Sequence, residues 1–155
     1  LSYEIVLITD KGNIDDKSFN QGSWEGVVEF AEREGISHHY IKPEEASDAG
    51  YLAAIDLAVQ GGAKVIVTPG FLFEVPIYEA QFKYPDVKFI LLDGSPHDPD
   101  YTDFTIKENV ASIRLFSRLC SSNGWNEKVR FHGWYGCTSR SSLWIWILTR
   151  GRRCS

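Results

Sequence analysis

The stretch YEIVLITDKGNIDDKSFNQGSWEGVVEFAEREGI, Tyr3–Ile36, decides the fold. It opens with a short β-branched run, Tyr3–Thr9, that lacks the polar–apolar alternation of a half-exposed strand. Such a run is typical of a parallel strand that is buried on both faces. Apolar residues then recur at three- and four-residue spacing over Phe19–Glu34, and Gly35 is a natural helix C-cap. The stretch therefore predicts the first strand and helix of an α/β domain.

The same alternation continues along the chain. Further strands are predicted at Ser37–Ile41, Lys64–Thr68, Val87–Asp93 and near Phe104–Lys107, and further helices at Tyr51–Gln60, capped by Ser47 or Asp48, and around Val75–Tyr84. Strands and helices that alternate with connections of a few residues predict a doubly wound parallel sheet with right-handed crossovers. After Ala111 the alternation stops.

Composition changes abruptly near Ser112. Twenty of the 21 Asp and Glu residues precede it, although the chain from Ser112 onward holds half of the 16 Lys and Arg. That last part also holds all three cysteines and four of the five tryptophans. We therefore predict an N-terminal lobe over residues 1–113 and a segment of different origin over 114–155. No apolar run is long enough to cross a bilayer, and a chain without methionine suggests a processing boundary at its start.

Polar residues follow three of the predicted strands where each strand ends. Asp10 and the loop GNIDDKSFNQ, Gly12–Gln21, follow the first strand, Gly70 and Phe71 follow the third, and Asp93 follows the fourth. Ligands bind outside the carboxyl ends of the strands in such sheets, so we expect these groups to share one site. Asp and Asn can hydrogen-bond the edge of a heterocyclic base, and an exposed Phe offers a stacking face. The pattern favours an uncharged polar ring system as ligand.

Other interpretations of the first loop remain open. Ser18 or Asp16 can cap the following helix, which does not exclude ligand contact and does not explain Phe19 and Asn20. The acidic residues Asp10, Asp15 and Asp16 can form a magnesium pocket of the response-regulator kind, but no lysine follows a later strand at the place where that scheme requires one. A small magnesium-dependent hydrolase built on the same three residues is a further alternative.

Known catalytic and cofactor motifs are missing from the sequence. It contains no glycine-rich phosphate loop, no zinc-type cysteine spacing and no nucleophile beside a base. His97 lies in a turn-rich loop and is expected to be solvated. We therefore predict no catalytic residue, no metal and no cofactor.

Three segments resemble the basic membrane protein family, the PnrA-like purine nucleoside-binding lipoproteins of ABC importers. They are the opening stretch, then GAKVIVTPGFLFEVPIYEAQFKYPDVKFILLDG, then TDFTIKENVASI. The resemblance covers Tyr3 to about Ile113. It implies a flavodoxin-like lobe of a type I periplasmic-binding-protein fold, without enzymatic activity. By this resemblance Phe19 would stack on the base, Asp16 and Asn20 would read its edge or fix the loop, and Asp93 would contact the ribose.

The resemblance also implies partners and a location. The ligand would be inosine, guanosine or adenosine, held by closure of two lobes and delivered to an ABC permease, with no nucleic acid involved. The protein would be extracytoplasmic and lipid-anchored to a bacterial membrane, through an anchor segment that this chain does not contain. A ligand-sensing regulatory domain of the same fold is the main alternative.

The family's next segments are missing from this reading frame and are recovered in the neighbouring one. HGWYGCT, His132–Thr138, can be encoded CAT GGG TGG TAT GGC TGT ACC, which one base later reads Met-Gly-Gly-Met-Ala-Val-Pro, a motif of the family. The single tryptophan codon becomes a glycine codon in that frame, and all four late tryptophans then fall where glycine is acceptable. We infer a frame-shifted translation from about Arg114, with the frame lost between Ser112 and Leu119. The alternative is a genuine basic tail that binds nucleic acid or a membrane.

The frame shift predicts a specific lesion in the gene. Sequencing the coding DNA should reveal a one-base insertion or deletion within the codons for Ser112–Leu119, followed by an open frame that encodes the family's second lobe. A gene with no such lesion and no open neighbouring frame would disprove the inference.

Overall fold

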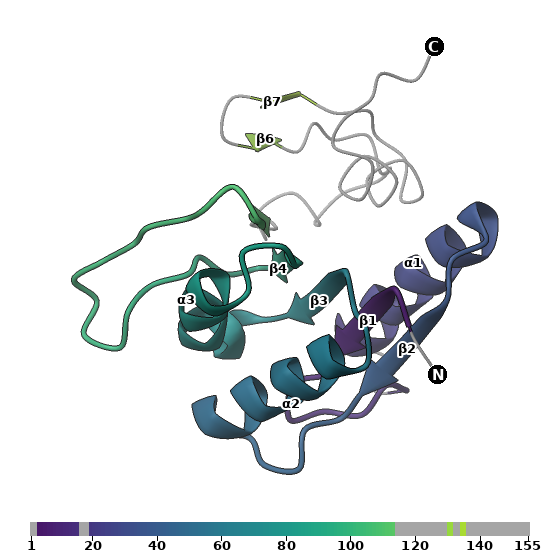
Figure 1. The fold of residues 1–155 in the computed structure, drawn as a ribbon, viewed down its shortest axis with the longest axis horizontal. Coiled ribbons are helices and arrows are strands. Elements are labelled where there is room, and N and C mark those ends of the chain that lie inside the picture. Colours follow the sequence, from purple (N-terminus) through teal and green to yellow (C-terminus); the bar gives the residue numbers. More distant parts are fainter. Residues whose placement is uncertain (1–2, 16–18, 114–129, 132–133, 136–155) are drawn as a thin grey trace, which may run out of the picture.

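The computed structural model describes residues 3–15, 19–113, 130–131 and 134–135 of the 155-residue chain (Figure 1). Strands and helices alternate through most of this part. In chain order the elements are β1 (Ile5–Ile8), α1 (Phe19–Glu34), β2 (His38–Ile41), α2 (Asp48–Gln60), β3 (Val65–Pro69), the 3₁₀ turn η1 (Phe71–Phe73), α3 (Glu74–Lys83), β4 (Lys88–Leu92), β5 (Val110–Ile113), β6 (Arg130–Phe131) and β7 (Trp134–Tyr135).

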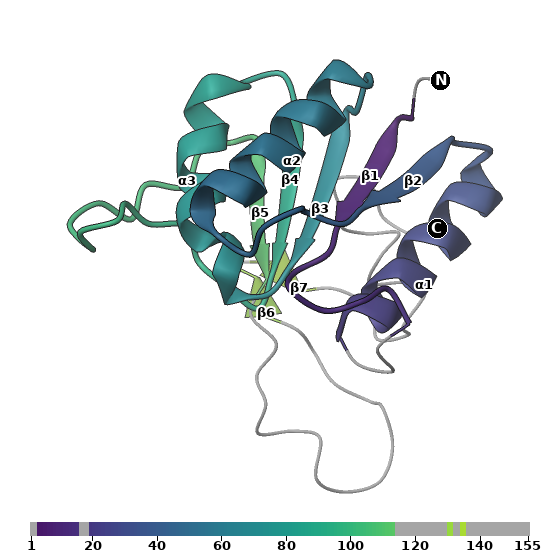
Figure 2. The ribbon, with the colours of Figure 1, turned by 90° about the horizontal axis from the view of Figure 1, so that it is seen from below.

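β1 to β5 form one parallel sheet in the order β2-β1-β3-β4-β5. β1 pairs on one side with β2, where Ile5 lies opposite His38, and on the other side with β3, where Ile5 lies opposite Val65. α1 covers one face of the sheet, and α2 and α3 cover the other (Figure 1, Figure 2). The predicted doubly wound α/β fold is confirmed. A separate two-stranded sheet pairs β6 with β7 in antiparallel fashion.

Two apolar clusters lie on opposite faces of the sheet. Val6 and Ile8 of β1 belong to the cluster beneath α2 and α3, whereas Ile5 and Leu7 belong to the cluster beneath α1. All four side chains are at most 2% exposed, as expected for a strand without polar alternation. The helices complete the clusters with Ile55, Ala58, Ile77 and Ala80 on one face and Val27 and Phe30 on the other.

Local sequence signals place the helix ends. The Ser47 side chain accepts a hydrogen bond from the Gly50 amide, so Ser47 is the N-cap of α2. Gly35 follows the last residue of α1, and its φ of +68° lies in the left-handed region that glycine adopts without steric cost. Both signals were readable from the sequence.

The strand predicted near Phe104–Lys107 is wrong. This segment lies outside every strand, and β5 forms at Val110–Ile113 instead. The buried Gln81 side chain forms hydrogen bonds with the backbone of this segment. Its amide nitrogen donates to the Thr105 carbonyl, and its amide oxygen accepts from the Lys107 amide, both at 2.9 Å. A helix side chain thus replaces a neighbouring strand as the backbone's partner.

The long connection from β4 to β5, residues 93–109, is bound to α3. The Tyr78 hydroxyl donates to the Asp103 carboxylate at 2.6 Å, and this hydrogen bond raises the pKa of Tyr78 to about 12. Hydrogen bonds from Thr105, together with the one from Tyr78, hold the pKa of Asp103 below its ordinary value. Side-chain hydrogen bonds therefore order a connection that contains no helix or strand.

Some predictions lie outside the described residues. Asp16 is one of them, and the packing of the chain from Arg114 onward is another, apart from the backbone of β6 and β7. Among the helices of the described part, none is both long and apolar enough to span a membrane.

Asn109 closes the carboxyl end of α3. Its side-chain amide lies within hydrogen-bond distance of three backbone carbonyls, those of Gln81, Tyr84 and Val87, at 3.1 to 3.3 Å. The residue is 6% exposed. Carbonyls at a helix end have no partner within the helix, so Asn109, which directly precedes β5, supplies a donor.

We expect Asn109→Ala to lower the free energy of unfolding by about 1–3 kcal/mol, because it leaves buried carbonyls without a donor. Urea denaturation of the 155-residue chain measures the change. The neighbouring exposed residue supplies the control, and Glu108→Ala should alter stability by less than about 0.5 kcal/mol. Equal losses of stability from the two substitutions would contradict the role of Asn109 as the donor to these carbonyls.

Candidate functional site

Three loops meet at the carboxyl edge of adjacent strands. Asp10 follows β1, Gly70 follows β3 and Asp93 follows β4, and these strands are neighbours in the sheet. The Gly70 amide donates to the Leu92 carbonyl at 2.8 Å, which joins the ends of β3 and β4 directly. Strand order reverses between β1 and β3, and ligands of such folds bind at that reversal. The strand order therefore brings the predicted loops to one edge.

Asp10 and Asn20 bind each other. The Asn20 amide nitrogen donates to Asp10 Oδ1 at 2.7 Å, and the Asp10 amide donates back to Asn20 Oδ1 at 3.3 Å. The same Asp10 oxygen accepts from the Gly12 amide at 2.6 Å. Asn20 is 2% exposed, whereas Asp10 is half-buried. This pair fastens the start of α1 to the end of β1.

Two aromatic rings of the predicted site differ in exposure. Phe19, the first residue of α1, is half-buried and packs against the apolar cluster beneath α1. Phe71 is 68% exposed and follows Gly70, whose φ of +104° turns the chain sharply out of β3. A ring this exposed presents apolar surface at the sheet edge that a planar ligand can cover.

Asp93 combines exposure with an unusual backbone. Its φ is +57°, in the left-handed region that few non-glycine residues adopt. Its side chain is exposed, and among the residues that the structure describes it makes no hydrogen bond or ion pair. An exposed carboxylate held in a strained turn at a ligand-binding edge is suited to accept hydrogen bonds from hydroxyl groups.

Sequence reasoning missed Thr9 and Tyr51 at this edge. Both hydroxyl oxygens are buried, and neither has a hydrogen-bond partner within the described part of the chain. Burial raises the pKa of Tyr51, and the nearby charges of Asp10 and Asp48 raise it further. In the sequence Tyr51 is only the first residue of a predicted helix, and its proximity to Asp10 depends on how α2 packs against β1.

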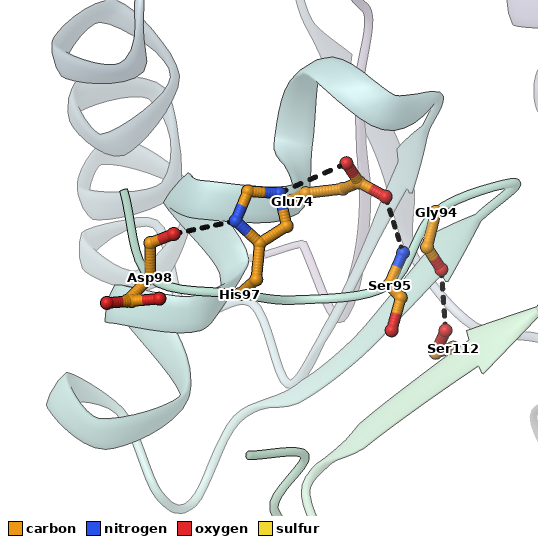
Figure 3. Close-up of polar contacts among 6 residues, drawn as sticks. All are labelled: Glu74, Gly94, Ser95, His97, Asp98 and Ser112. Carbon is orange, nitrogen blue, oxygen red and sulfur yellow. Dashed lines mark hydrogen bonds and ion pairs between the residues drawn. The ribbon is translucent and has the colours of Figure 1, made fainter. Parts of the chain in front are cut away.

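His97 and Glu74 were also missed. The sequence predicts a solvated His97, but the side chain is buried, 4% exposed. Its Nε2 faces the Glu74 carboxylate (Figure 3). The Tyr101 ring stacks on the imidazole. Glu74 begins α3 and lies beside the loop that follows Asp93. The only sequence signal was the acidic residue in the first turn of a predicted helix.

A magnesium pocket at the first loop gains no support from the geometry. Among the described residues, which include Asp10 and Asp15, no group of three or more His, Cys, Asp or Glu side chains is placed to hold a metal ion. One carboxylate oxygen of Asp10 already accepts from two N–H groups.

The family described as ABC transporter substrate-binding protein PnrA-like matches residues 3–117. The CD4+ T-cell-stimulating antigen of Listeria monocytogenes is 28% identical over 116 residues, covering 72% of this chain and 30% of that protein. The ABC transporter nucleoside-binding protein BmpA of Lactococcus lactis is 28% identical over 112 residues, covering 69% and 31%. This chain thus spans about 30% of the length of these relatives.

A solved structure shows the same relationship. The ABC transporter system solute-binding protein of Aeropyrum pernix K1 superimposes with a TM-score of 0.60 at 28% identity, over 71% of this chain and 28% of that protein.

The Asp10 and Asn20 pair can be tested by an isosteric change. Asn20→Asp should lower the free energy of unfolding by about 2–4 kcal/mol at neutral pH. The substitution replaces the amide that donates to the Asp10 carboxylate with a second carboxylate, so two negative charges lie in contact. The loss should shrink as the pH falls, since protonation of either carboxyl removes the repulsion.

Asn13→Asp is the matched control, because exposed Asn13 accepts from Lys42 at 2.5 Å and a carboxylate there gains an ion pair. Thermal or urea unfolding across pH measures both variants. A pH-independent loss in Asn20→Asp, or an equal loss in Asn13→Asp, would contradict the assigned hydrogen bonds.

Proposed function

The chain belongs to the PnrA-like family of ABC transporter substrate-binding proteins, and from that premise we propose that it is the N-terminal lobe of a purine nucleoside-binding protein. One observation carries the proposal: an exposed aromatic ring and an exposed carboxylate follow adjacent strands at the ligand-binding edge of the sheet. The Lactococcus lactis relative described as nucleoside-binding supports the same ligand class.

The proposed contacts divide between the base and the sugar. Phe19 and Phe71 supply apolar ring surface for the base, and Asp93 accepts hydrogen bonds from the ribose hydroxyls. Asp16 reads the edge of the base or fixes its loop, as the family resemblance implies. The Asp10 and Asn20 pair joins the end of β1 to the start of α1, which limits the entropy lost at this junction when the ligand binds.

A second lobe completes the site under this proposal. One lobe leaves the opposite face of the base in water, and closure of two lobes excludes that water. The match to the family ends at residue 117, close to the change in composition, which supports a frame shift within 112–119 and a truncated product. The protein with the frame restored is called the frame-corrected protein below.

The family consists of solute-binding proteins of ABC transporters and not of enzymes. We propose that the frame-corrected protein delivers its ligand to an ABC permease from an extracytoplasmic position on a lipid anchor. Relatives from Pyrococcus described as lipoproteins support this location. A regulatory sensor and a small hydrolase are not favoured.

The binding prediction is measured by calorimetry with inosine, guanosine and adenosine. The frame-corrected protein should bind at least one of them. Asp93→Ala and the loss of a stacking ring, Phe19→Ala or Phe71→Ala, should each weaken binding by about 1–3 kcal/mol. Phe82→Ala is the control, because Phe82 is 44% exposed on α3 and belongs to none of the three loops.

The 155-residue chain should bind weakly or not at all, because under the proposed frame shift its last residues do not encode the closing lobe. Tight nucleoside binding by this chain would show that the site is misplaced. Failure of the frame-corrected protein to bind any purine nucleoside, or strong binding of a sugar or an amino acid, would show that the ligand class is wrong.

A further inference from the structure

The turn after β4 is held in its strained shape from two sides. Gly94 is buried, and its carbonyl accepts a hydrogen bond from the Ser112 hydroxyl of β5 at 2.5 Å. The next amide, that of Ser95, donates to Glu74 Oε1 at 2.7 Å (Figure 3). A left-handed non-glycine residue persists only where its surroundings enforce it. Asp93 directly precedes these two anchored residues, so they enforce its conformation.

Glu74 also packs against the turn. A Cβ atom on Gly94 would lie 3.1 Å from Glu74 Cγ and 3.2 Å from Glu74 Oε1. The glycine therefore lets the carboxylate approach the backbone closely, on the way to its hydrogen bond with Ser95. The turn and the start of α3 are built to fit each other.

His97 fixes the other carboxylate oxygen of Glu74. Its Nε2 lies 3.3 Å from Glu74 Oε2, and its Nδ1 lies 2.7 Å from the Asp98 carbonyl oxygen. Both partners are hydrogen-bond acceptors, and a ring nitrogen that carries a proton donates to the acceptor it faces. The Tyr101 ring stacks on the imidazole at a centroid distance of 4.0 Å. Glu74 is thereby held in one orientation, with its side chain 21% exposed.

Helix capping alone does not account for this arrangement. A carboxylate in the first turn of α3 is favourable beside the positive end of the helix, but an exposed one would serve equally well. Capping requires neither the hydrogen bond to Ser95 nor a buried histidine on the second oxygen. Both features act on the segment that begins at Asp93.

We propose that Glu74, held by His97 and assisted by Ser112, is a positioning residue that presents the Asp93 carboxylate to the sugar hydroxyls of the ligand. The inference rests on the proposed nucleoside function and names the part of the ligand that the turn recognises. Glu74 acts through Asp93 and contacts no ligand. Its effect on binding should therefore require both Asp93 and a ribose.

The test measures binding of inosine and of hypoxanthine, the same base without ribose, to the frame-corrected protein. Glu74→Ala should weaken inosine binding about tenfold, because the turn must then be ordered during binding. It should leave the affinity for hypoxanthine unchanged. In the double variant with Asp93→Ala, the Glu74 substitution should have no further effect, since the two residues act as one unit.

Glu74→Gln is the conservative variant. Its amide oxygen can accept from the Ser95 amide, and its amide nitrogen can donate to Nε2 of a neutral His97 whose Nδ1 donates to Asp98. Inosine affinity should therefore stay within about twofold of the parent, the scatter expected when hydrogen bonds are kept. A substitution that merely loosened the fold would weaken the binding of both inosine and hypoxanthine.

A readout without ligand uses the 155-residue chain. Amide hydrogen exchange at Ser95 should accelerate in Glu74→Ala and remain slow in Glu74→Gln, because only the first removes the acceptor. Unchanged exchange in Glu74→Ala would overturn the proposal even if that variant bound ligand poorly.

The outcomes separate this inference from the proposed function. If Asp93→Ala weakens inosine binding and Glu74→Ala does not, the nucleoside function stands and the positioning role is wrong. Equal losses for inosine and hypoxanthine, or additive losses in the double variant, also overturn the positioning role. If no purine nucleoside binds, the proposed function fails and this inference fails with it.

Discussion

The pairing of β1 with β2 on one side and β3 on the other is the constraint on which the molecule depends. Because consecutive strands lie on opposite sides of β1, the chain must cross one face of the sheet with α1 and the other with α2. The loops that leave β1 and β3 therefore diverge at the carboxyl edge. Side chains from distant parts of the sequence gather where the loops part.

The structure assigns different physical roles to the residues at this edge. Asp10 and Asn20 satisfy each other and bind the loop to the sheet, at the cost of burying polar groups that must stay paired. Phe71 and Asp93 remain exposed on backbone that turns sharply. Under the proposed function the paired residues provide rigidity and the exposed residues provide recognition, which limits the entropy lost on binding.

Signals of short range made most of the fold predictable. The buried β-branched strand, the Ser47 cap and the glycine after α1 each act within a few residues, and the structure confirms them. The Phe104–Lys107 strand was predicted wrongly because Gln81, more than twenty residues away, binds that backbone. His97 was misjudged for the same reason, since its partner Glu74 lies 23 residues earlier. Composition describes a loop's average environment and carries no information about one buried contact within it.

The central claim is that the carboxyl edge of β1, β3 and β4 binds the base and sugar of a purine nucleoside. A crystal structure of the frame-corrected protein grown with inosine tests it most directly. The account predicts the base against an aromatic ring of the first or third loop and a ribose hydroxyl within hydrogen-bond distance of the Asp93 carboxylate. Inosine bound elsewhere on the protein, or bound here with Asp93 turned away from the ribose, would contradict it.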